Sequence, residues 1–324
     1  MIQTRGKQLI QKAVSEGVHD LYLIPSQGQY ECFVRQSDER QFYEKIDFSI
    51  GEQLISHFKF LAGMNVGEKR RPQLGACDYV YEADQTVMIR LSTVGDYLGQ
   101  ESLVVRFLHN KKKELRFWFD RPQDLVNIVT GRGLYLFAGP VGSGKTSLMH
   151  YLAEKRFSQK QVMSIEDPVE IRSDQILQLQ LNETIGMTYD NLIKLSLRHR
   201  PDLLIIGEIR DSETAQAVIR ASLTGATVFS TIHAKSIPGV YARLRELGVS
   251  PKEIDNSLQA IIYQRLIKGG GVIDYATERF DQHKPDKWNQ KMADLVDQGH
   301  LTRQEQTAEE IRAEERKESH PAVK

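Results

Sequence analysis

The chain has 324 residues, of which 27% are charged and 40% hydrophobic, and its formal net charge is +0. This composition is typical of a soluble protein of about two domains, and it excludes a strong overall field for direct nucleic-acid binding. The two cysteines, Cys32 and Cys77, exclude a disulfide framework and a four-cysteine zinc site and suit a reducing cytoplasm.

The first 109 residues are predicted to form a small α+β (PAS-like) domain. Apolar residues at helical spacing cover residues 1–18 and 51–61, and strand-like stretches lie at 20–24, 30–35, 78–81, 86–91 and 102–107. A lysine-rich break at residues 110–114 follows, which is typical of a solvated loop. We therefore expect a linker over residues 110–120.

A second domain is expected over residues 121–275, where strands and helices alternate from residue 133 onward, which is typical of a parallel sheet wrapped by helices. Strands are expected at residues 134–138, 162–165, 203–206 and 227–233. A capping box at Ser250 and Glu253 predicts a helix that continues through Ile262 and Leu266. Residues 276–324 are expected to form a polar helical tail with an exposed or disordered end.

Residues 139–146 fit the phosphate-binding pattern G-x-x-x-x-G-K-[ST] and lie between an expected strand and an expected helix. Glycines let main-chain N–H groups turn toward a phosphate, and a helix N-terminus adds partial positive charge. Lys145, in a loop expected to be open to solvent, would reach the β and γ phosphates, and Thr146 would hold Mg²⁺. The sequence thus predicts a site for ATP and Mg²⁺ made of Gly139, Pro140, Val141, Gly142, Ser143, Gly144, Lys145, Thr146 and Ser147.

Three further candidates follow expected strands, at the sheet edge where doubly wound sheets bind ligands. Glu166 opens an acidic run, Glu208 follows a fully apolar strand, and His233 ends another strand. A carboxylate at such a place suits phosphoryl transfer. From the residues alone, a solvated acidic turn and an ordinary core or surface histidine stay open as alternatives.

Together these motifs resemble those of the secretion and pilus-assembly ATPases, the GspE/PilB-like type II/IV secretion family. Residues 139–146 are similar to the family's Walker A motif, 164–170 to its Asp box, 198–211 to its Walker B region and 230–233 to its His box. Residues 15–20, 61–73, 89–93 and 264–266 also have counterparts there. The resemblance covers residues 10–270.

The resemblance implies a RecA-like P-loop ATPase fold for residues 121–275 and a homohexamer. It implies that Glu166 is the base for the attacking water, Glu208 lies at the metal and His233 senses the γ-phosphate, although the two glutamates could exchange roles. Arg90 and Arg106 match arginines that reach the phosphates in the family. Their spacing alone favours outward-facing arginines in half-buried strands.

The departures from the family are informative. No cysteine follows residue 233, so the four-cysteine zinc element of larger members is missing, and we expect the chain to lack their extra N-terminal domain. Val141 and Ala226 replace a usual threonine and histidine, and neither change should abolish hydrolysis because main-chain groups line the loop. A short, zinc-free chain of this kind resembles the competence ATPases of Gram-positive bacteria.

That resemblance implies a cytoplasmic motor that assembles a pseudopilus for DNA uptake. No apolar run approaches the roughly 18–20 residues of a membrane span, and no secretory signal is evident. Attachment to the membrane would therefore come through a polytopic inner-membrane platform protein. Two alternatives stay open: a retraction motor, which the neighbouring genes would distinguish, and a nucleotide-dependent scaffold with negligible turnover, which phosphate release would distinguish.

Overall fold

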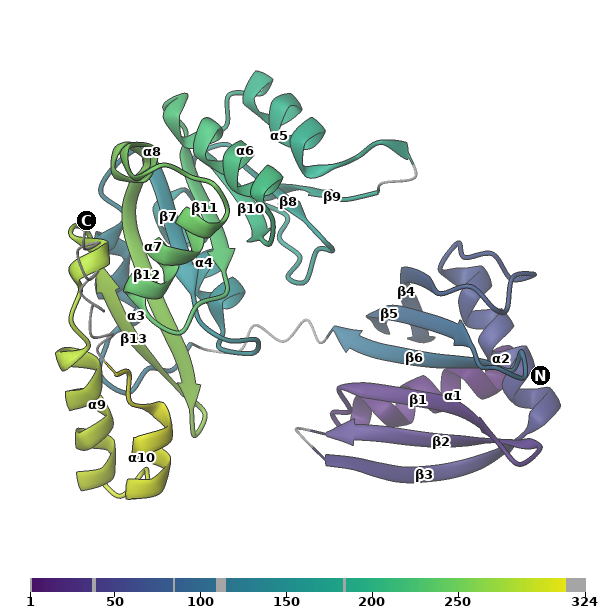
Figure 1. The fold of residues 1–324 in the computed structure, drawn as a ribbon. Helices are drawn as coiled ribbons and strands as arrows, with labels where there is room; N and C mark the ends of the chain where they lie inside the picture. The colour runs from purple at the N-terminus through teal and green to yellow at the C-terminus, as the bar shows by residue number, and fades with distance from the viewer. Residues whose placement is uncertain (1, 37–38, 84, 109–114, 183–184, 313–324) are drawn as a thin grey trace, which may run out of the picture. The chain divides into compact units, whose positions relative to one another are not determined.

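The computed structural model describes residues 2–36, 39–83, 85–108, 115–182 and 185–312. The chain divides into two compact units, residues 1–112 and 113–324, and each is drawn in Figure 1. The division falls within the predicted linker, but the end of that stretch is bound to the second unit, where the main-chain N–H of Trp118 donates to the oxygen of Gly271 at 3.0 Å. Among the helices that the structure describes, none is both long and apolar enough to cross a membrane.

The smaller unit is built on a six-stranded antiparallel sheet, sheet A, with the order β3-β2-β1-β6-β5-β4. Its helices are α1 (Ile2–Ser15) and α2 (Phe48–Leu61). Its strands are β1 (Asp20–Ser26), β2 (Gln29–Gln36), β3 (Glu39–Asp47), β4 (Gln73–Glu82), β5 (Gln85–Gly95) and β6 (Glu101–Leu108). Strand β3 is not among the stretches predicted from the sequence.

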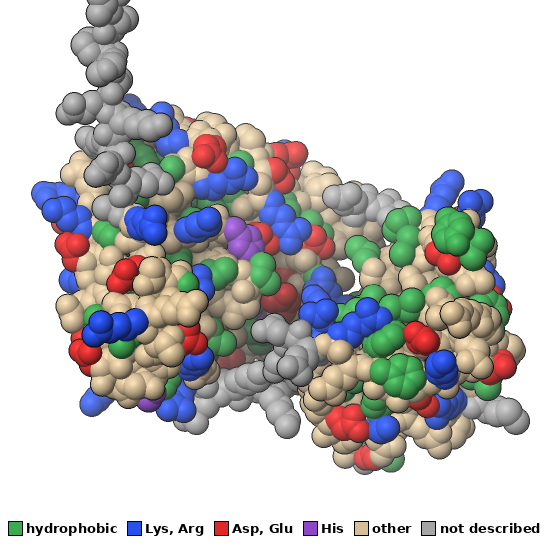
Figure 2. All heavy atoms as spheres, turned by 60° about the horizontal axis from the view of Figure 1, so that its bottom comes forward, with side chains coloured by type: hydrophobic (Ala, Val, Ile, Leu, Met, Phe, Trp, Pro, Cys, Tyr) green, Lys and Arg blue, Asp and Glu red, His purple; other side chains and the backbone are tan. Residues whose placement is uncertain are grey.

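Apolar side chains alternate along the strands of sheet A and pack against its two helices. Leu21 and Leu23 on β1 and Val105 on β6 are fully buried in one core with Ile10 of α1 and Phe58 of α2. Because successive residues of a strand point to opposite faces, the residues between them lie on the uncovered face of the sheet. In the view of Figure 2, acidic and basic side chains are interspersed over each unit, in keeping with the net charge of +0.

The larger unit is built on a seven-stranded sheet, sheet B, with the order β13-β12-β7-β11-β10-β8-β9. Neighbouring strands are parallel except for the antiparallel β12–β13 pair, so the sheet is mixed rather than purely parallel. Its strands are β7 (Gly133–Ala138), β8 (Val162–Glu166), β9 (Ile176–Gln180), β10 (Leu203–Ile209), β11 (Thr227–Ile232), β12 (Leu258–Ile267) and β13 (Gly270–Ala276).

Helices cover both faces of sheet B (Figure 1), which explains why every residue of β7 is buried. Tyr135 and Phe137 pack against Leu148 of α4, whereas Leu134 and Leu136 belong to a separate core on the other face. The helical segments are α3 (Pro122–Leu125), η1 (Val126–Ile128), α4 (Lys145–Arg156), α5 (Tyr189–Arg198), α6 (Ser212–Leu223), α7 (Ile237–Glu246), α8 (Pro251–Ser257), η3 (Phe280–Gln282), α9 (Asp286–Asp297) and α10 (Arg303–Glu309).

The helix predicted from the capping box at Ser250 is wrong beyond its first turns. Helix α8 ends at Ser257, and the residues expected to continue it form β12. This strand is inserted between β7 and β13, and its Ile261, Ile262 and Tyr263 are buried. A short apolar run fits a buried helix or a buried strand equally well by periodicity, and here pairing with the distant β7 decides.

Residues 305–312, the described part of the end expected to be exposed, contain no buried residue, but contacts hold this part of the chain to the larger unit. Leu301 is 7% exposed, the Glu309 carboxylate forms an ion pair with Arg265 on β12, and Nε1 of Trp288 donates to the main-chain oxygen of Glu309 at 2.8 Å. This segment therefore packs against the larger unit. The expectation for residues 313–324 lies outside the described residues.

Candidate active site

The glycine-rich loop leaves β7 and leads directly into α4. Gly139, Gly142 and Gly144 have φ angles of 140°, 75° and 85°, which glycine adopts without steric cost. A Cβ on Gly139 would lie 2.2 Å from the main-chain oxygen of Gln264 on β12, so no side chain fits there. The loop is held close to a neighbouring strand, while Val141 at its tip is 86% exposed.

Lys145 is the first residue of α4, and it lies inside the loop rather than in open solvent. It is 8% exposed, and its Nζ donates to the main-chain oxygens of Gly139 and Pro140, at 2.9 and 2.8 Å. Burial lowers the pKa of Lys145, and the carboxylates of Glu208 and Glu170 act in the opposite direction.

The loop residues fit a phosphate ligand. The hydroxyl of Ser143 is buried and has no hydrogen-bond partner among the described residues. Phosphate oxygens accept hydrogen bonds and carry negative charge, so an ammonium group, a free hydroxyl and the N-terminus of α4 suit them. Thr146 and Ser147 continue the loop into the first turn of that helix.

Glu166 is the last residue of β8 and is 4% exposed. Its Oε1 accepts hydrogen bonds from Oγ of Ser164, at 2.6 Å, and from Nε2 of Gln178, at 3.1 Å. The first donor lies on the same strand and the second on β9, so two neighbouring strands fix this carboxylate at the carboxyl edge of the sheet.

Glu208 and His233 come from neighbouring strands and meet directly. Nε2 of His233 lies 3.0 Å from Oε1 of Glu208, and Nε of Arg210 donates to Oε2 of Glu208 at 2.9 Å. On β11, Oγ1 of Thr231 donates to the main-chain oxygen of Gly207 at 2.7 Å, where the pairing of β10 with β11 shifts register. Arg210 thus orients the Glu208 carboxylate.

Arg90 and Arg106 lie in the smaller unit, opposite each other on β5 and β6. The two expected strands at 86–91 and 102–107 are thus neighbours in sheet A. Nε of Arg106 donates to Oδ1 of Asp20 on β1 at 2.7 Å, and 59% of the Arg106 side chain is exposed. These side chains alternate with the buried residues of their strands, so they lie on the face that α1 and α2 leave uncovered.

Sequence reasoning missed several residues that support this edge. Gln264 is 3% exposed against the loop, and Gln178 and Ser164 hold Glu166. His150 on α4 is 3% exposed, and neither ring nitrogen has a partner among the described residues. Burial lowers the pKa of His150, while the Glu166 carboxylate raises it. Gln264 and Ser164 carried a signal, as parts of the family-like segments 264–266 and 164–170, whereas Gln178 and His150 carried none.

Comparison with known proteins gives a consistent result. The model of a family described as "Type II/IV secretion system protein" matches residues 1–317. The competence protein ComGA of Streptococcus pneumoniae is 58% identical over 311 residues, which cover 96% of this chain and 99% of ComGA. The type IV pilus assembly ATPase PilB of Thermus thermophilus is 33% identical over 272 residues, which cover 81% of this chain and 30% of PilB. Among solved structures, the pilus retraction motor PilT with bound ADP matches with a TM-score of 0.74 at 20% identity, over 94% of this chain and 97% of PilT.

Proposed function

Because the chain belongs to the type II/IV secretion system protein family, we propose that it is a motor ATPase that drives assembly of a competence pseudopilus for DNA uptake. The observation that carries the proposal is the gathering of Lys145, Glu166, Glu208 and His233 at the carboxyl edge of sheet B. The similarity to PilB, which is described as an ATPase, supports ATP hydrolysis as the reaction. The 58% identity with the competence protein ComGA, over nearly the whole length of ComGA, supports the competence pseudopilus as the machine that the motor drives.

We propose that the glycine-rich loop binds the phosphates of ATP. The ADP bound in the PilT structure supports an adenine nucleotide as the ligand. On binding, Lys145 would exchange the oxygens of Gly139 and Pro140 for phosphate oxygens. The hydroxyl of Thr146 and the Glu208 carboxylate would hold Mg²⁺, which neutralises charge on the phosphates. The described residues contain no group of three or more His, Cys, Asp or Glu that could hold a metal. Oxygen ligands supplied largely by the nucleotide suit Mg²⁺.

The two glutamates have different surroundings, and these support different roles. Both oxygens of Glu208 are engaged, by Arg210 and His233, which suits a fixed negative charge at the metal. We propose that Glu166 accepts the proton of the attacking water and that His233 senses the γ-phosphate. The alternative assignment exchanges the two glutamates.

The remaining parts of the proposal follow from the family. We propose a homohexamer in which Arg90 and Arg106 reach the phosphates when the N-terminal unit closes on the nucleotide. Developing negative charge on the γ-phosphoryl group is what such arginines stabilise. The motion would be passed to a polytopic platform protein, through which the chain attaches to the membrane.

Phosphate release by the purified full-length chain tests the proposal. With ATP and Mg²⁺ the unaltered chain should release phosphate steadily, and Lys145→Ala should abolish release, because the ammonium that contacts the loop is lost. Circular dichroism should show that the variant is folded. Equal release by both proteins would rule out the ATPase, and no release by either would favour a scaffold.

A further inference from the structure

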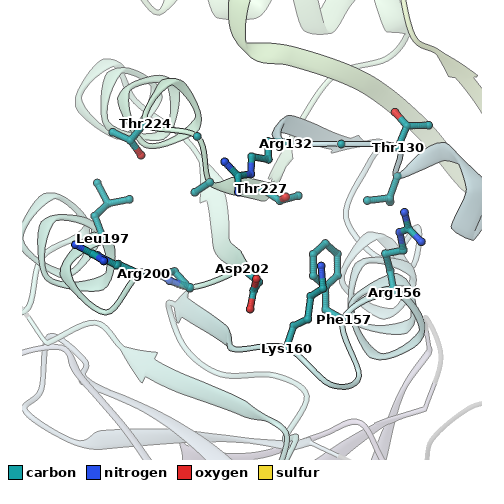
Figure 3. A pocket seen from close by; sticks show the side chains of 15 residues that line it. Thr130, Arg132, Arg156, Phe157, Lys160, Leu197, Arg200, Asp202, Thr224 and Thr227 are labelled. Carbon is teal, nitrogen blue, oxygen red and sulfur yellow. The ribbon is translucent and has the colours of Figure 1, made fainter.

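A cavity of about 720 Å³ (Figure 3) is lined by residues that precede strands of sheet B. It therefore lies at the amino edge of the sheet, whereas the glycine-rich loop follows the carboxyl end of β7. Its walls come from the segments before β7, β10 and β11 and from the end of α4 with the turn after it. Strand β7 separates the two edges, and six residues at about 3.3 Å each span about 20 Å. A nucleotide on the loop therefore does not fill this cavity.

The cavity is strongly basic. Arg132, Arg156, Lys160 and Arg200 line it together with one carboxylate, that of Asp202. Oδ2 of Asp202 accepts from the main-chain N–H of Gln161 at 3.0 Å. Among the residues that the structure describes, none of the four cations forms an ion pair with a carboxylate. In Figure 3, Arg132 and Lys160 extend from opposite sides, with Arg156 and Arg200 toward the two ends.

Helix dipoles explain only part of this charge. Arg156 lies in the last turn of α4, where a cation is favoured without any ligand. Arg132 lies outside the helices, and its Nη1 is 3.7 Å from where a Cβ on Gly225 would be. A Cβ at that distance would be in ordinary van der Waals contact, so the guanidinium borders Gly225, whose φ of 90° follows the end of α6. Nζ of Lys160 lies 5.6 Å from the ring centre of Phe157, so an apolar wall and not a carboxylate holds it.

We propose that this cavity binds a ligand that carries phosphate groups, at a second anion site separate from the nucleotide loop. Cations without carboxylate partners can form charge-assisted hydrogen bonds with phosphate oxygens. The hydroxyls of Thr130, Thr224 and Thr227 add donors to the walls. Four cations in a cavity of about 720 Å³ could contact two linked phosphates at once.

Calorimetric titration with inorganic pyrophosphate tests the proposal. The titration uses the full-length chain with Lys145→Ala, so that the glycine-rich loop does not compete and the result is independent of ATP hydrolysis. Adding Arg132→Ala and Lys160→Ala should weaken binding at least about tenfold, because each removes a charged hydrogen-bond donor. Binding should also weaken as salt is added.

The matched control removes two positive charges elsewhere in the same unit. Lys252→Ala with Lys284→Ala alters two exposed lysines that do not line the cavity. Affinity for pyrophosphate should be unchanged in this pair. A loss of similar size in both pairs would mean non-specific attraction and would overturn the proposal.

A lipid headgroup is the other source of the same phosphate chemistry, and co-sedimentation with phosphatidylglycerol vesicles distinguishes it. Pyrophosphate binding that depends on Arg132 and Lys160 identifies a soluble ligand. Vesicle binding that depends on the same pair, without pyrophosphate binding, identifies a headgroup. Binding to neither probe, or binding insensitive to the cavity pair, would overturn the proposal.

Discussion

The two edges of sheet B use charged side chains in different ways. At the carboxyl edge the charges are paired or held: Glu208 contacts Arg210 and His233, and Oε1 of Glu166 accepts two hydrogen bonds. At the amino edge, Arg132 and Lys160 lie beside a glycine and a phenyl ring without a carboxylate partner among the described residues. Paired groups have a geometry set before any ligand binds, which suits catalysis. Unpaired cations suit binding, since a ligand supplies the missing charge.

The largest expected effect concerns the stability of the sheet that joins these edges. In a chain that ends at Gly299, the free energy of unfolding should be lower by about 2–4 kcal/mol. Such a chain loses the buried Leu301 and the contacts of Glu309 with β12 and α9. We expect the melting temperature to fall by at least about 5 °C. Leu301→Ala should give part of this loss, and Leu223→Ala, at a side chain that is 50% exposed, almost none. An unchanged melting temperature on truncation would show that this segment adds nothing.

The next effect tests whether the carboxyl edge is sufficient for hydrolysis. Arg90→Ala and Arg106→Ala should each lower turnover at least about tenfold, or about 1.4 kcal/mol, because each removes a guanidinium proposed to stabilise the γ-phosphoryl charge. Arg35→Ala is the matched control, since Arg35 pairs with Asp20 in the register of β1 and β2 on the same row of sheet A. Melting curves should accompany the rates because Arg106→Ala leaves the buried Asp20 without its partner. Full turnover in both variants would mean that Arg90 and Arg106 do not contribute to hydrolysis.

The smallest effect is expected at the amino edge. Arg132→Ala with Lys160→Ala should change ATP turnover by less than about twofold, or about 0.4 kcal/mol, because neither side chain contacts the carboxyl edge. Phosphate release measured without added pyrophosphate checks this. A tenfold loss of turnover in this pair would mean that the two edges do not act separately.

How far the sequence could predict these regions depended on where the determining contacts lie. The glycine-rich loop, Glu166, Glu208 and His233 belong to local motifs that follow apolar strands, so they could be placed at one edge without coordinates. The strand β12 could not be predicted, because only pairing with β7 and β13 distinguishes it from a helix. The amino-edge cavity could not be predicted either, since its residues come from four separate segments, of which only the one with Arg200 and Asp202 belongs to a motif, and that motif points to the other edge.

The central claim is that the carboxyl edge of sheet B hydrolyses ATP, and Glu208→Gln tests it most directly. Phosphate release and ATP affinity are measured on the same variant, which keeps the volume of the side chain and removes its charge. We predict that ATP affinity stays close to that of the unaltered chain, since the loop and Lys145 bind the phosphates, while turnover falls by about 10²–10³-fold. If affinity fell in step with turnover, Glu208 would be a binding residue, and unchanged turnover would contradict the assignment of hydrolysis to this edge.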